Sequence, residues 1–319
     1  MLKYVIKRVL LLFVTLFIIV TICFVLIKLL PWELPQEAAQ KESMMRRLEA
    51  QGYNKPIPVQ YVRYLKNIVR HWDFGTSWKI DKMKPVWDVF AERFPPTVLI
   101  NVYSLLIATP IGIILGIYAA VKKNKWQDQF ISTSVMIFVS VPSYVYGFLV
   151  QYFLYFKWDL LPPTVLSLAD AGGSWFTWKM FVSMLPPVIA LAFGSVASLC
   201  RYTRAELTEA LTSDYMLLAR TKGLTRAQAT SRHALKNAMV PILPMILGGF
   251  LDIMAGSFVI EKIFSVPGVG QLYIQSINQL DYDVFMLDTI FYTFIGLMAG
   301  IVTDLSYGFI DPRIRMGEK

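Results

Sequence analysis

Residues Val9–Leu30 read VLLLFVTLFIIVTICFVLIKLL, an apolar run in which Lys28 is the only charged residue. An α-helix needs about 20 mostly apolar residues to cross the hydrocarbon core of a bilayer. Lys3, Lys7 and Arg8 precede the run, as in a secretory signal peptide. The run is too long for a signal peptide, however, and no small-residue cleavage site follows it. The stretch therefore predicts a retained membrane-spanning helix.

The rest of the chain repeats this pattern. Of its 319 residues, 55% are hydrophobic and only 17% are charged, whereas an average soluble domain has about 25% charged residues. The apolar residues are gathered into long runs, which excludes a disordered chain, a coiled coil and a disulfide scaffold, and disfavours a soluble enzyme. The sequence predicts an all-α polytopic membrane protein with six transmembrane helices. The six runs are 9–30, 97–120, 130–156, 180–200, 238–260 and 285–308.

Basic residues decide the predicted orientation, because short cytoplasmic loops carry an excess of Lys and Arg. With the N-terminus inside, the inner segments contain 16 such residues and the two short outer segments contain 3. We therefore expect both termini in the cytoplasm. The net charge of +9 then reflects membrane topology and does not indicate a nucleic-acid partner. The inner segments are 1–8, 121–129, 201–237 and 309–319, and the short outer segments are 157–179 and 261–284.

The long segment 31–96 is expected outside the cell as a mostly helical cap. Helices are predicted at 36–51, 58–72 and 86–94. In the second helix, apolar residues recur every three or four positions and form one stripe. The cap either packs on the membrane surface or docks a partner outside the cell, and the sequence favours neither alternative. The stripe consists of Val59, Val62, Leu65, Ile68, Val69 and Trp72.

The chain is thus predicted to have three parts. Residues 1–30 form the N-terminal tail and first span, and residues 31–96 form the extracytoplasmic cap. Residues 97–319 form a five-span core that includes the cytoplasmic loop 201–237.

Residues suited to catalysis or metal binding are scarce. The two cysteines, Cys23 and Cys200, lie in opposite leaflets of the predicted topology, so a disulfide between them is implausible. With only two histidines, the sequence has no HExxH motif and no His-rich metal centre. The P-loop that binds ATP and the GxSxG motif of hydrolases are also missing from the sequence. We expect a non-catalytic protein with no cofactor or metal of its own.

The cytoplasmic loop 201–237 is long for a turn, strongly basic and compatible with helix. Asp214 is suited to cap a first helix, and Gly223 is suited to the left-handed conformation that ends many helices. Thr225 can cap a second helix that runs to Asn237. The loop predicts a helix–glycine–helix unit along the inner membrane surface, whose simplest role would be that of a positively charged anchor.

Several separated motifs resemble those of one family. DYMLLARTKGL at 214–224, followed by RHALKNA at 232–238 and Pro241, closely resembles the EAA loop of permease subunits of ATP-binding cassette (ABC) importers. It looks most like the B-type permease of dipeptide and oligopeptide importers. The resemblance covers nearly the whole chain, and the motifs stand in the expected order among the spans. The others are FGTS at 74–77, ERFP at 92–95, FSVPGVG at 264–270 and DPRIR at 311–315.

The resemblance implies a fold and a set of partners. The fold would be that of type I ABC importer permeases in the bacterial cell membrane, surrounded by lipid. Two homologous permease subunits, forming a heterodimer, would enclose the pathway for a peptide substrate. Two cytoplasmic ATPase subunits would bind ATP and Mg²⁺, and an extracytoplasmic binding protein would deliver the peptide. This chain would supply half of the pathway and one coupling element.

In such importers the EAA loop contacts the ATPase. Carried over to this sequence, the contact is expected at Tyr215, Ala219, Arg220, Lys222 and Gly223. The founding Glu-Ala-Ala is replaced here by Leu-Leu-Ala, so a contact that depends on the glutamate is not carried over.

Acidic residues near the spans are further candidates. Asp252 lies in the middle of the fifth predicted span, where a charge costs about 2.5–3.5 kcal/mol on insertion scales. It is expected either to line the pathway or to be a hydrogen-bonded packing residue. Asp281 and Asp283 lie in an outer segment and are expected to help dock the binding protein.

Two other protein classes compete with the importer subunit. A self-sufficient secondary transporter or channel would use Asp252, Asp288 and Asp304 for ion coupling, but six spans are few and no inverted repeat is visible. An intramembrane enzyme would need a catalytic motif, which the sequence lacks. Because the sequence has no P-loop, the energy for transport would come from another polypeptide.

Overall fold

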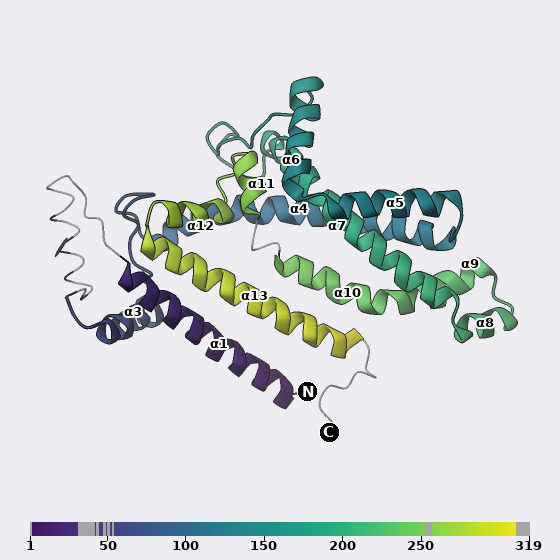
Figure 1. Ribbon diagram of the computed structural model, residues 1–319, viewed down its shortest axis with the longest axis horizontal. Coiled ribbons are helices and arrows are strands. Elements are labelled where there is room, and N and C mark those ends of the chain that lie inside the picture. Colours follow the sequence, from purple (N-terminus) through teal and green to yellow (C-terminus); the bar gives the residue numbers. More distant parts are fainter. Residues whose placement is uncertain are drawn as a thin grey trace. The chain divides into compact units, whose positions relative to one another are not determined.

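The computed structural model describes residues 2–30, 54–252 and 257–310, together with residues 42, 45, 46, 49 and 52. These residues are mostly helical and contain no strand beyond an isolated bridge between Thr76 and Pro85. The all-α prediction is confirmed (Figure 1). The helices are α1 (Leu2–Leu29), α3 (Ile57–His71), α4 (Val86–Val121), α5 (Trp126–Ser140), α6 (Ser143–Gln151), the π-helix η1 (Tyr152–Lys157), α7 (Trp178–Leu211), α8 (Asp214–Thr221), α9 (Arg226–Ala229), the π-helix η2 (Thr230–Ala234), α10 (Leu235–Asp252), α11 (Phe258–Ile263), α12 (Val269–Asn278) and α13 (Tyr282–Ile310).

Helices α1, α4, α7 and α13 are each long and apolar enough to cross a membrane. The third predicted span, 130–156, is not one straight helix. It is bent by 100° between α5 and the α6–η1 pair. Pro142 lies at the break and disfavours helical conformation in the preceding Val141, which is extended. If this bent pair is one span, up to five spans are present among the described residues.

The fifth predicted span, 238–260, coincides with α10 only as far as Asp252. Residues 253–256 lie outside the described part of the chain, and α11 follows them. The protein is therefore an all-α polytopic membrane protein, while the count of six spans and the cytoplasmic position of both termini stay predictions.

Two helices are longer than their predicted spans. The predicted helix at 86–94 is the first part of α4, which continues through Pro95, Pro96 and Pro110. Such prolines are tolerated in membrane helices, because neighbouring groups satisfy the carbonyls they leave free. Helix α7 continues beyond the predicted end at Cys200 to Leu211 and so supports the loop that is predicted to be cytoplasmic.

The chain forms two compact units. The first unit contains residues 95–271 with 1–6 and 295–319, and the second contains residues 7–94 with 272–294.

In the first unit, α5, α6 and α10 pack against α7 (Figure 1). Gly112 and Gly116 let α4 approach α7 closely. A Cβ atom added at Gly112 would lie 2.7 Å from the Leu199 Cβ, and one added at Gly116 would lie 2.5 Å from the Thr203 Cβ. These glycines therefore serve packing within the chain.

In the second unit, α3 packs on α1 through tyrosines. The Phe24 ring lies 5.1 Å from the ring of Tyr61 and 5.2 Å from that of Tyr64. Gln60 is buried on the same face. The predicted apolar stripe is not buried within the described chain as a whole, because Val62 and Val69 are exposed. The spacing of apolar residues does not show which of two apolar strips on one helix is buried. Here the tyrosine strip, which carries the larger apolar area, packs on α1.

Candidate functional site

The loop predicted to be cytoplasmic contains α8, which ends at a left-handed glycine. Gly223 has a φ of +91°. Its N–H donates to the Arg220 carbonyl oxygen (3.0 Å), and the Leu224 N–H donates to the Ala219 carbonyl oxygen (3.3 Å). This pair of bonds is the Schellman motif, which satisfies carbonyls that a helix end would otherwise leave free. The predicted role of Gly223 as a helix end is confirmed.

The second helix of the loop starts at a capping box. The Thr225 hydroxyl accepts from the Gln228 N–H (3.3 Å), and the Gln228 side chain accepts from the Thr225 N–H (3.0 Å). Helix α9 continues through η2 into α10, so the loop leads directly into the fifth predicted span. The predicted cap at Asp214 is wrong. Ser213 is the N-cap residue, and Asp214 lies in the first turn, where its negative charge interacts favourably with the positive end of the helix dipole.

Helix α8 has one buried and one exposed face. Met216 and Ala219 are buried in a cluster with residues of α7, α9 and η2. Leu217 and Leu218 are 65% and 56% exposed. Ala219 follows Met216 by three positions, so the two residues share a helix face. Because that face packs inside the loop, Ala219 does not reach a partner. The sequence analysis did not identify the exposed leucines. Consecutive residues of a helix point in different directions, so Met216, Leu217 and Leu218 could not all lie on one buried face.

The other expected contact residues of this loop are at the surface. Tyr215 is 37% exposed, and Arg220, Lys222 and Gly223 are exposed as well. Together with Leu217 and Leu218 they form a surface with an apolar centre and basic neighbours. We call these six residues the α8 surface. In Figure 1, α8 and α9 lie together beyond the end of α7.

A buried ion pair fastens α5 to the part of α7 that supports the loop. The Arg204 guanidinium donates to both oxygens of Asp128, Nε to Oδ1 (2.5 Å) and Nη2 to Oδ2 (2.8 Å). Asp128 is 2% exposed and also accepts from the Asn124 N–H and the Ser132 hydroxyl. Bidentate pairing of this kind fixes orientation as well as adding energy.

Replacing Arg204 with alanine is expected to destabilise the first unit by about 2–3 kcal/mol, because it leaves a buried carboxylate without its partner. The midpoint of thermal unfolding in detergent would measure this loss. Arg204→Lys should lose less, since it keeps the charge but not the planar fork. The double variant Asp128→Asn with Arg204→Met removes both charges and should be more stable than Arg204→Ala. An unchanged midpoint in Arg204→Ala would contradict the pairing.

A second polar cluster organises the FSVPGVG motif. Glu261 of α11 accepts from the Thr97 hydroxyl (2.8 Å) and from the Gln271 N–H (2.8 Å). The Thr97 hydroxyl in turn accepts from the Val269 N–H (2.9 Å). These groups cap the N-terminus of α12, whose first N–H groups have no partner within the helix. Burial raises the pKa of the Glu261 carboxyl from 4.5 to about 7, while the hydrogen bonds limit the rise.

The same cluster explains the first glycine of this motif. A Cβ atom added at Gly268 would lie 2.5 Å from the Glu261 carboxyl group and from the Thr97 hydroxyl oxygen. Only glycine fits between them without displacing the cap.

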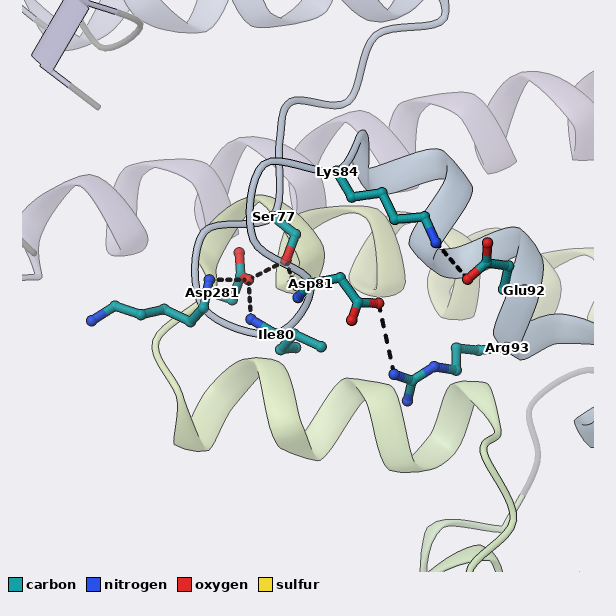
Figure 2. Close-up of polar contacts among 8 residues, drawn as sticks. Ser77, Ile80, Asp81, Lys84, Glu92, Arg93 and Asp281 are labelled. Carbon is teal, nitrogen blue, oxygen red and sulfur yellow. Dashed lines mark hydrogen bonds and ion pairs between the residues drawn. The ribbon is translucent and has the colours of Figure 1, made fainter. Parts of the chain in front are cut away.

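In the second unit, Asp281 binds a backbone loop. Its Oδ2 accepts from the Ser77 hydroxyl (2.7 Å) and from three successive N–H groups, those of Trp78 (3.1 Å), Lys79 (3.0 Å) and Ile80 (3.1 Å). Figure 2 shows the Ser77 and Ile80 contacts on this carboxylate. Convergent backbone N–H groups form a concavity that stabilises negative charge.

The geometry changes the expected role of Asp281. The residue is 1% exposed, and its Oδ2 is occupied within the chain. It is therefore not available to a second protein. Asp283 is half-buried, and its Oδ2 accepts from the Thr76 N–H (3.2 Å). With Lys28 and Asp73 it lines a cavity of about 40 Å³. A docking role stays a prediction for Asp283 alone.

The chain matches two descriptions of one protein family. Residues 112–316 match the binding-protein-dependent transport system inner membrane component, and residues 1–101 match the N-terminal part of such membrane components. The chain belongs to this family.

Curated relatives match this family member over their full length. The dipeptide transport system permease protein DppB of Bacillus subtilis is 35% identical, with 100% of both chains covered. DppB of Lactococcus lactis is 34% identical, with 99% of this chain and 100% of the relative covered. The glutathione transport system permease protein GsiC of Escherichia coli K12 is 32% identical, with 99% of both chains covered.

Membership defines this protein as a membrane component of a transport system and not as an enzyme. The described residues contain no group of three His, Cys, Asp or Glu side chains that could hold a metal ion. The side chain of Asp252 and the DPRIR motif lie outside what the structure describes. Pathway lining by Asp252 therefore stays a prediction.

Proposed function

We propose that this permease is a subunit of an ATP-driven importer of peptides. The similarity to dipeptide and glutathione permeases supports a short peptide or peptide-like substrate. The partners would be a second, homologous permease subunit, two ATPase subunits that bind ATP and Mg²⁺, and a binding protein outside the cell.

The α8 surface is the observation that carries this proposal. It presents two leucines at a cytoplasmic loop, and Met216 and Ala219 anchor it to the end of α7. Exposed apolar side chains surrounded by polar ones are typical of protein interfaces. Arg220 and Lys222 add charges suited to acidic groups on an ATPase. A partner that moves α8 would move α7 and, through α9 and η2, α10.

Transport would then follow an alternating-access cycle. Closure of the ATPase pair on ATP would push α8, rock the spans and open the pathway toward the docked binding protein. The free energy comes from ATP hydrolysis in the partner subunits, and this chain transmits the movement.

A pulldown of the tagged chain in mild detergent, with mass spectrometry of the bound proteins, tests the assembly. We expect ATPase subunits and a second permease to be recovered. A chain that purifies alone and still moves solute in liposomes without ATP would overturn the proposal in favour of a secondary transporter.

Reversing the charge of Arg220 with Arg220→Glu is expected to abolish peptide uptake and the stimulation of ATPase activity by substrate, because the basic border of the α8 surface is lost. Leu218→Asp should have the same effect through the apolar centre. Uptake into proteoliposomes that contain the complete transporter is the measurement. Lys123→Glu, an equal reversal at an exposed position of another predicted inner loop, is the matched control and should transport normally. Normal uptake by both α8 variants would exclude this surface as the ATPase contact.

A further inference from the structure

Helix α3 exposes apolar side chains that nothing in the described chain covers. Val62 and Val69 are 64% and 83% exposed, and Trp72, directly after the helix, is 59% exposed. Val62 and Val69 are two helical turns apart and therefore lie on one side of α3. A different side of the helix carries Tyr61 and Tyr64, which pack on α1.

Basic residues form a second strip beside the exposed valines. Arg63, Lys66 and Arg70 are exposed and recur at spacings of three and four, so they share a helix face. Helix α3 contains no acidic residue. An apolar strip beside a Lys/Arg-rich strip, with tryptophan at the end, is the pattern of helices that lie in a membrane interface.

Contacts with α1 place α3 at membrane depth. The apolar stretch of α1 between Arg8 and Lys28 is about 28 Å long, which matches the hydrocarbon core of a bilayer. Thr21 lies about 10 Å along the helix axis before Lys28. The Thr21 and Tyr61 hydroxyl oxygens are 2.6 Å apart, and the Phe17 and Tyr61 rings are 6.1 Å apart. Helix α3 thus contacts α1 at a point that lies within the membrane-crossing stretch of α1, before the Lys28 end.

We propose that α3 lies in the membrane interface at the Lys28 end of α1, with phospholipid covering its exposed face. Val62, Val69 and Trp72 contact acyl chains, and Lys66 and Arg70 contact headgroup phosphates. On the neighbouring α1, Ile18 and Ile22 are 50% and 53% exposed in a predicted span. The extracytoplasmic cap of the predicted topology is then anchored in the outer leaflet, and the membrane-packing alternative holds for α3.

Nitroxide labels on the assembled transporter test this proposal. In a Cys23→Ala and Cys200→Ala background, single cysteines are introduced as Val69→Cys and, independently, Val62→Cys. The transporter is placed in nanodiscs of phosphatidylcholine and phosphatidylglycerol. Collision rates are then measured with oxygen, which concentrates in acyl chains, and with a water-soluble nickel complex. Ile18→Cys gives the lipid reference, Lys123→Cys, exposed in another predicted inner loop, the aqueous reference, and Arg70→Cys the neighbouring position on the basic strip.

We expect the ratio of oxygen to nickel collisions at positions 62 and 69 to approach that at position 18 and to exceed that at position 123 several-fold. Position 70 should give an intermediate ratio. A ratio at both valine positions equal to that at position 123 would show an aqueous surface and overturn the proposal. Low collision rates with both reagents would show a covering protein and overturn it as well. Labelled variants are compared only where their thermal unfolding midpoint matches that of the unlabelled protein. Because positions 62 and 69 are labelled independently, one of them still gives the test if the other variant does not fold.

Discussion

Gly223→Pro is expected to abolish peptide uptake and to uncouple ATP hydrolysis from substrate, while membrane insertion stays normal. Gly223 has a φ of +91°, whereas proline fixes φ near −65°. Proline also removes the N–H that donates to the Arg220 carbonyl oxygen. The left-handed turn that ends α8 could not form, and Leu217 and Leu218 would lose their rigid support. Uptake and substrate-stimulated ATPase activity in proteoliposomes with the complete transporter measure the effect.

Gly223→Asn is the matched control, because asparagine tolerates the left-handed conformation. A Cβ atom at this position meets no other atom within 4 Å, so the strain in any variant comes from the backbone alone. We expect near-normal transport in Gly223→Asn and an intermediate loss in Gly223→Ala, for which the left-handed backbone costs about 1–2 kcal/mol. Full transport by Gly223→Pro would refute the role of α8 as a coupling element.

Glu261→Ala is expected to destabilise the FSVPGVG segment by about 2–4 kcal/mol. The substitution leaves the Gln271 N–H and the Thr97 hydroxyl without their acceptor, and each orphaned buried group costs about 1–3 kcal/mol. Hydrogen exchange of the amides of residues 264–271, corrected for intrinsic rates, is the direct measurement, and we expect their protection to fall. Thr97→Val, which removes the hydroxyl at nearly constant volume, should act in the same direction but more weakly.

The raised pKa of the Glu261 carboxyl also predicts that the stability of the folded protein depends on pH, with a defined sign. The pKa of its carboxyl is about 7 in the folded protein, against 4.5 ordinarily, because burial disfavours the charged form. The folded state therefore binds this proton more tightly than the unfolded chain. The resulting stability, about 3 kcal/mol, is complete below pH 4.5 and is lost as the pH rises through 7.

Thermal unfolding at pH 5 and pH 8 tests this dependence. The midpoint of the native protein should be lower at pH 8, and the difference should shrink in Glu261→Gln, which keeps the shape without the titrating group. An equal difference in both proteins would show that other groups cause the pH dependence.

Much of the local structure of the loop 212–237 could be predicted from the neighbouring sequence. Gly223 and Thr225 occupy the positions where a helix end and a capping box need them, and both depend on neighbours within a few residues. The faces of α8 could not be assigned in the same way. Ala219 was expected at the partner surface, yet it is buried, because contacts with α7, α9 and η2 decide which side of a short helix faces inward.

The outer segments show the same limit. Asp281 looked like an exposed docking residue in the sequence, since an acidic side chain in a loop is usually solvated. Its partners, Ser77 and the N–H groups that follow it, are about 200 positions away in the chain, so no local pattern reveals them. The pairs Asp128–Arg204 and Thr97–Glu261 were missed for the same reason.

The sequence alone determined that this protein is an all-α membrane protein and, through its ordered motifs, which family it belongs to. Those properties depend on the length of apolar runs and on short motifs, which are local quantities. Tertiary structure decided where the third span bends, which residues α8 presents to a partner, which acidic groups are buried, and which side of α3 is free to meet lipid. Each of these depends on contacts between residues distant in the chain, and hydrophobicity along the sequence does not encode the partners in such contacts.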